Sequence, residues 1–131
     1  MYLDRVTGVI DFDNVPANDS LLLLSMNGFK LKSEAYGDSR LPLSDHYDLF
    51  EHFPNLQQLS LASTDIDSIE FVEKLPYLQY LDITENRVTS LKPLESLADF
   101  WRVDCGGNTI LEFLSDDKYI YVNTDSEYYP Y

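Results

Sequence analysis

The segment between Leu56 and Ile110 repeats itself every 22 residues. The intervals from Leu56 to Leu78 and from Leu78 to Phe100 are both 22. Four further columns follow at the same interval: Leu59, Leu81 and Val103; Leu61, Ile83 and Cys105; Thr64, Asn86 and Asn108; and Ile66, Val88 and Ile110. Because five columns agree in polarity across three rows, we interpret the segment as stacked copies of one structural unit rather than as an ordinary amphipathic stretch.

The apolar columns predict one short strand in each row. Alternate side chains of a strand point to opposite faces, so Leu59 and Leu61 enter the core. Gln58, Ser60 and Ala62 then face outward. Rows stacked in this way form a parallel sheet in which each coil buries its apolar side against the next.

The polar column predicts a turn whose backbone groups are buried. Such groups need a side-chain partner, and the carboxamides of Asn86 and Asn108 offer both a donor and an acceptor, for which Thr64 is a weaker substitute. Each row then returns through a short helical or extended arc with apolar residues three apart: Ile69, Val72 and Leu75 in one row, and Leu91, Leu94 and Leu97 in the next.

The row pattern L-x-x-L-x-L-x-x-N-x-I resembles the leucine-rich repeat. The 22-residue period and the return arc Lys92-Pro93-Leu94 are most similar to the bacterial, internalin-like class. The resemblance implies an α/β fold, a short solenoid with a parallel β-sheet on its concave face and short helical or extended return arcs. It also implies binding of another protein and no catalysis, with Cys105 buried in the core.

The 131 residues fit one domain. Residues 1–20 are predicted to form an N-terminal cap with a degenerate strand over Val9–Asn14, and residues 21–55 a first repeat with an insertion in Lys32–Pro42 and a helix over Ser44–Phe53. That helix would begin at Ser44 or Asp45 and end at Pro54. Regular repeats occupy residues 56–110, and residues 111–131 supply a C-terminal cap strand, Lys118–Asn123, followed by the acidic tail Thr124–Tyr131.

Charge and composition restrict the partners. Nine basic residues against 23 acidic ones give a net charge of −14, which disfavours nucleic acid and anionic membranes. The negative charge either keeps the protein soluble or attracts a basic protein. No apolar run reaches the roughly 18 residues of a membrane helix, and Leu21–Leu24 does not fit a signal peptide. We therefore expect a cytoplasmic protein, or else an expressed fragment of a secreted one.

The sequence gives little support to enzyme activity. It contains no G-x-x-x-x-G-K, G-x-S-x-G or H-E-x-x-H motif. Cys105 could act as a nucleophile only if it were exposed beside a base. His46 and His52 lie six residues apart, on different faces of the predicted helix, so they do not form a metal pair. We expect no cofactor and no metal.

The outward strand positions are the best candidates for binding. Asp82 and Asp104 fall in one column on neighbouring strands, where like charges require a counter-charge. Arg102 can supply it within the sheet; alternatively, a partner's Lys or Arg supplies it, with Tyr80 and Trp101 as aromatic anchors. The predicted partner-binding residues are Gln58, Ser60, Tyr80, Asp82, Thr84, Trp101, Arg102 and Asp104. The insertion 32–42 and the acidic tail are the alternative surfaces.

Three functions follow. The first is a small acidic inhibitor or immunity-type protein that neutralises a basic toxin or nuclease. The second is a recognition fragment of a larger secreted or surface protein. The third, an enzyme, requires a reactive Cys105.

Overall fold

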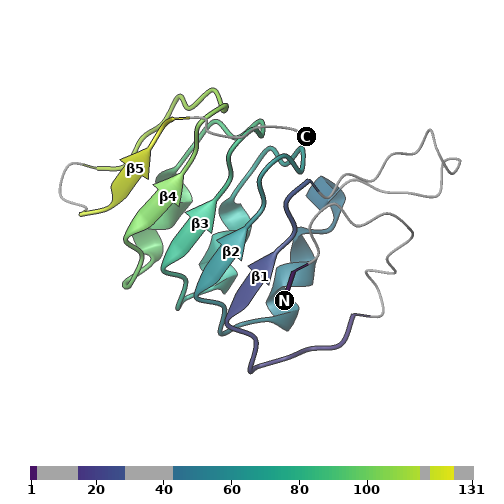
Figure 1. Ribbon diagram of the computed structural model, residues 1–131. Helices are drawn as coiled ribbons and strands as arrows, with labels where there is room; N and C mark the ends of the chain where they lie inside the picture. The colour runs from purple at the N-terminus through teal and green to yellow at the C-terminus, as the bar shows by residue number, and fades with distance from the viewer. Residues whose placement is uncertain (3–14, 29–42, 116–118, 126–131) are drawn as a thin grey trace, which may run out of the picture.

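The computed structural model describes residues 1–2, 15–28, 43–115 and 119–125. Within them, five three-residue strands form one parallel sheet in chain order, and short 3-10 helices lie behind it (Figure 1). The strands are β1 (Leu23–Ser25), β2 (Gln58–Ser60), β3 (Tyr80–Asp82), β4 (Arg102–Asp104) and β5 (Tyr121–Asn123). The helices are η2 (Leu43–Asp45), η3 (Tyr47–His52), η4 (Glu70–Lys74) and η5 (Lys92–Ser96).

The register of the sheet confirms the 22-residue columns. Leu59 pairs with Leu81, and Leu81 pairs with Val103, so the middle residues of β2, β3 and β4 form one line. All three are fully buried. The core lies between this side of the sheet and the return arcs, whose predicted apolar residues are buried too: Ile69, Val72, Leu75, Leu91, Leu94 and Leu97.

The two asparagines of the polar column bind backbone groups in matching ways. The Asn86 Oδ1 atom accepts hydrogen bonds from the N–H groups of Thr64 (3.0 Å) and Ile66 (3.2 Å). Its Nδ2 atom donates to the carbonyls of Leu61 (2.8 Å) and Ile83 (2.9 Å). One carboxamide therefore joins two consecutive coils through backbone groups that are out of reach of water.

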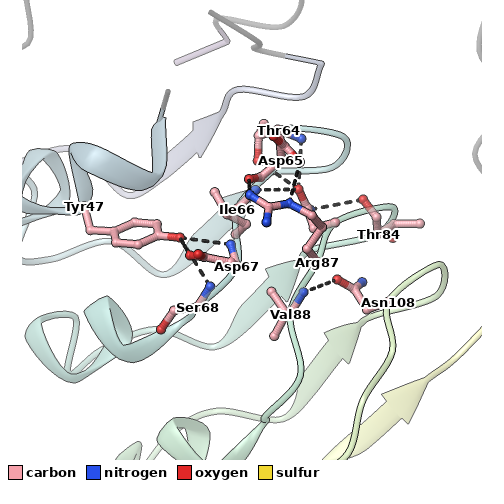
Figure 2. A network of polar contacts seen from close by, with 11 residues as sticks. Tyr47, Thr64, Asp65, Ile66, Asp67, Ser68, Thr84, Arg87, Val88 and Asn108 are labelled. Atoms are coloured by element: carbon pink, nitrogen blue, oxygen red, sulfur yellow. Dashed lines mark hydrogen bonds and ion pairs between the residues drawn. The ribbon is translucent and has the colours of Figure 1, made fainter. Parts of the chain in front are cut away.

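Asn108 repeats the arrangement one coil later. Its Oδ1 atom accepts from Val88 N–H at 2.9 Å (Figure 2), and its Nδ2 atom donates to the carbonyls of Ile83 (2.8 Å) and Cys105 (3.0 Å). Thr64 retains only part of the pattern, because its hydroxyl donates to the Leu61 carbonyl at 2.8 Å. The ranking of Thr64 as the weaker substitute follows from this smaller set of bonds.

A column of left-handed residues follows the strands. Gly28, Ser63, Glu85 and Gly107 occupy equivalent positions, with φ of 69°, 57°, 58° and 74°. Only glycine adopts this region without a steric penalty from Cβ. At Gly107 an added Cβ would lie 2.5 Å from the Glu85 Cδ atom. This turn position is thus left-handed in four described coils, and only two of the four residues suit it.

Replacing Glu85 by glycine should therefore stabilise the protein, by about 0.5–1 kcal/mol, because the penalty for a left-handed residue disappears. Urea unfolding measures the change. The matched control is Glu73→Gly, a change of the same residue type at an exposed position in η4 where φ is negative. That variant should lose about 0.5–1 kcal/mol. Two changes of the same sign would contradict this account.

The helix predicted over Ser44–Phe53 is wrong in detail. The segment forms two 3-10 helices that are separated at His46, where φ is −131°. Ser44 and Asp45 do not begin a helix there, since both lie inside η2. The break lets the segment bury Leu43 as well as the predicted apolar residues Leu49, Phe50 and Phe53. Contact with the core therefore decides its conformation more strongly than helix propensity does.

Tyr47 joins this irregular coil to the first regular repeat (Figure 2). Its hydroxyl oxygen accepts hydrogen bonds from Asp67 N–H (3.1 Å) and Ser68 N–H (3.2 Å), and its proton goes to Asp67 Oδ1 (2.8 Å). Two coils later, the equivalent N–H groups of Leu111 and Glu112 bind a backbone carbonyl instead, at 2.7 and 3.1 Å. The phenol oxygen thus takes the place of a carbonyl of the preceding coil. Burial raises the pKa of Tyr47 to about 12.

The two ends of the sheet differ. At the first end, Tyr2 forms a parallel bridge with Ser25 of β1. At the other end, β5 confirms the predicted C-terminal strand for Tyr121–Asn123. The predicted strand at 9–14, the insertion at 32–42, Lys118 and most of the tail (126–131) lie outside the described residues.

The last coil buries its apolar columns less completely than the inner coils do. Phe113 occupies the column of Ile69 and Leu91, yet 49% of its surface is exposed, against 1% and 0% for those two. Ile120 and Val122 are only partly buried. The core is therefore densest at β2, β3 and β4 and thins toward β5.

Candidate functional site

We call the side of the sheet that faces away from the core and the 3-10 helices the sheet face; it carries the first and third residues of each strand. At the carboxyl ends of the strands it contains a depression of about 240 Å³. The residues lining it are Asn27, Ala62, Asp82, Thr84, Arg102, Asp104, Asn123 and Asp125. Three carboxylates and one guanidinium make the depression acidic.

Asp104 accepts from two neighbours on the sheet face. Its Oδ1 atom receives a hydrogen bond from Arg102 Nε at 3.0 Å, and its Oδ2 atom receives one from the Tyr80 hydroxyl at 2.5 Å. The bond to Asp104 raises the pKa of Arg102. Burial, followed by the bond to Asp104, raises the pKa of Tyr80, so the phenol stays protonated and keeps donating. The counter-charge predicted from Arg102 is therefore present.

Asp82 lies directly beside Asp104, as the columns predict. Its Oδ1 atom accepts from the backbone N–H (2.9 Å) and the hydroxyl (2.5 Å) of Thr84. Burial raises the pKa of Asp82, the bonds from Thr84 lower it, and the charge of Asp104 raises it again. Arg102 is bonded to Asp104, and among the described residues no ion pair joins Asp82 to a basic side chain.

The other predicted site residues are not all gathered at the depression. Gln58 begins β2 and Trp101 precedes β4, so both lie at the amino ends of the strands. The Trp101 side chain is exposed there. Ser60 donates to Asn27 Oδ1 at 2.7 Å. Thr84 is at the depression but buried.

Ala62 lines the depression, in keeping with its predicted outward position, although only 3% of its surface is accessible. Its N–H group donates to Asn27 Oδ1 at 2.8 Å, so the side chain of the preceding coil lies against this residue.

Sequence analysis assigns no binding role to three residues of this surface, Asn27, Tyr121 and Asn123. Asp125, which follows β5, belongs to the acidic tail that the sequence offers as an alternative surface. Tyr121 pairs with Arg102 although the interval between them is 19 residues, not 22. Alignment of the last strand by its alternating pattern, rather than by the repeat length, would have found it.

Groups that could carry other chemistry are few in the described part of the chain. Cys105 is buried with a free thiol, as predicted, and burial raises its pKa to about 11. No cluster of three His, Cys, Asp or Glu side chains suited to a metal ion occurs among the described residues. Nor does this part of the chain contain a helix long and apolar enough to cross a membrane.

Comparison with protein families agrees with this geometry. Residues 54–96 match the family model described as leucine rich repeats, in two copies. The fold is a short leucine-rich-repeat solenoid. The match covers β2, β3 and the arcs η4 and η5. Leucine-rich repeats generally mediate contacts between proteins and are typically non-catalytic. A search of curated proteins found no match.

Proposed function

We propose that this chain is a non-catalytic protein-interaction module, a small acidic inhibitor or immunity-type protein that binds a basic partner through its sheet face. The observation that carries this proposal is the acidic depression at the strand ends, where Asp82, Asp104 and Asp125 meet a single Arg102. The net charge of −14 would steer a basic protein toward it.

Further features support the remaining parts of the proposal. The burial of Cys105 favours a protein without catalysis. The 22-residue interval favours the bacterial, internalin-like class. We place the protein in the cytoplasm, in keeping with its one cysteine. We assign it neither a nucleic acid nor a membrane as partner, since its charge opposes both.

A second candidate function is that of a recognition fragment of a larger secreted or surface protein. The exposure of Phe113 and the partial burial of Val122 favour it, because a further coil stacked on β5 would cover both side chains.

The first test is a pull-down from source-cell lysate at low and high salt. Native protein is compared with Asp82→Lys/Asp104→Lys, and with Glu70→Lys/Glu73→Lys as the control of equal net charge on η4. We expect native protein and the control to retain a basic protein at low salt, and the sheet-face variant to lose it. Equal capture by all three proteins would refute the sheet face as the site. Circular dichroism confirms that each variant is folded.

A further inference from the structure

Two tyrosines from neighbouring strands flank one guanidinium on the sheet face. Tyr80, Arg102 and Tyr121 are paired in register on β3, β4 and β5. The Arg102 Cζ atom lies 5.9 Å from the centre of the Tyr80 ring and 5.2 Å from that of Tyr121. Both distances are in the range of cation–π attraction. With Asp104, which holds Arg102 from the same strand, the two tyrosines form what we call the tyrosine cage (Tyr80, Tyr121 and Asp104).

Arg102 occupies the cage through few bonds. Among the described residues, the guanidinium donates one hydrogen bond, from Nε to Asp104 Oδ1 at 3.0 Å. The ion pair is single rather than bidentate, and 35% of the Arg102 side chain is exposed. Ion pairs of this kind contribute about 1 kcal/mol or less. Arg102 is therefore held by one ion pair to the Asp104 side chain, of which only 13% is exposed, and by the two ring contacts.

We propose that the tyrosine cage is a recognition site for an arginine side chain of the partner, and that Arg102 is its internal occupant, which the incoming arginine displaces. This inference rests on the proposed function and names the side chain of the partner that the sheet face recognises. Arginine fits better than lysine, because a planar guanidinium stacks on tyrosine rings and binds a carboxylate with two parallel hydrogen bonds.

The displaced Arg102 side chain has carboxylates within reach. Asp82 and Asp125 line the same depression as Arg102, so its charge is compensated on leaving the cage. The exchange replaces one guanidinium on Asp104 by another and brings one positive charge into an acidic depression. Selectivity would come from the cage, and attraction from the surrounding charge.

The test uses small probes, so that it does not depend on an identified partner. N-acetyl-arginine amide is titrated into native protein and into Arg102→Ala, with N-acetyl-lysine amide as the comparison and NMR shifts as the readout. We expect Arg102→Ala to bind the arginine probe about tenfold more tightly than native protein does, and more tightly than it binds the lysine probe. Arg102 is partly exposed, and because its removal takes the counter-charge from Asp104, circular dichroism checks that the variant is folded.

A matched pair of tyrosine variants locates the effect. Arg102→Ala/Tyr121→Ala should lose the gain, and Arg102→Ala/Tyr119→Ala should keep it, because Tyr119 is 98% exposed and has no ring contact with Arg102 among the described residues. Equal affinity of native protein and Arg102→Ala for arginine would overturn the proposal. So would equal affinity of Arg102→Ala for arginine and lysine. Preferential binding of an N-acetyl-aspartate probe by native protein would also do so, since Arg102 would then be an anchor for anions.

The two proposals can fail separately. If Arg102→Ala takes up arginine while the pull-down shows no dependence on the sheet face, the cage stands and the proposed basic partner falls. If the pull-down succeeds but Arg102→Ala gains no affinity for arginine, the basic partner stands and the cage is refuted.

Discussion

Replacement of Asn86 by alanine should lower the free energy of unfolding by about 4 kcal/mol, because several buried backbone groups lose their partners at once. Two N–H groups and three carbonyls of consecutive coils bind this one side chain, and Asn86 itself is 7% exposed. Each orphaned group costs about 1–3 kcal/mol where water cannot reach it. Urea unfolding monitored by circular dichroism measures the loss.

Two substitutions serve as controls. Asn86→Thr should recover part of the loss, since a threonine hydroxyl can bind the carbonyl three residues earlier, as Thr64 does with Leu61. Asn108→Ala should cost less, because Asn108 is only partly buried. If Asn86→Ala unfolds within about 1 kcal/mol of native protein, the carboxamide is not what joins the coils.

Replacement of Phe50 by alanine should cost about 3–5 kcal/mol, the range for a large side chain removed from a packed core. Phe50 is fully buried, and its ring stacks on Phe71 with 4.6 Å between centroids. Phe50 belongs to η3 and Phe71 to η4, so this contact joins the irregular coil to the first regular repeat. Thermal unfolding gives the measurement.

Two further variants distinguish the loss of core packing from the loss of any aromatic ring. Phe50→Leu keeps most of the volume and should lose markedly less than Phe50→Ala. Tyr77→Ala removes a ring that is 53% exposed and should change stability little. A loss at Phe50 no larger than that at Tyr77 would mean that the irregular coil does not stabilise the repeats.

The regular repeats were predictable because their information is periodic. A 22-residue interval fixes the apolar columns, and the columns fix the register in which Asp82 meets Asp104. Arg102 was one of two counter-charges that the sequence offered for this pair, and its Nε atom lies 3.0 Å from Asp104 Oδ1.

Features that break the period were not predictable in the same way. The left-handed column contains Ser63 and Glu85, which carry no sequence signal for positive φ. The Tyr47 hydroxyl accepts two N–H groups that a backbone carbonyl binds in a later coil. Tyr47 lies outside the regular rows, so none of the repeat columns indicates this role. Tyr121 reaches Arg102 after a coil three residues shorter than the repeat, so it was missed.

The gradual thinning of the core toward β5 has a mechanical consequence. In a solenoid whose strands pair only with their sequence neighbours, a pulling force passes along the row of coils. Phe113 is half exposed and Val122 only partly buried, whereas the row through Leu59, Leu81 and Val103 is fully buried. Under such a force, we expect the described part of the solenoid to open first at β5 and to resist opening from β2 to β4.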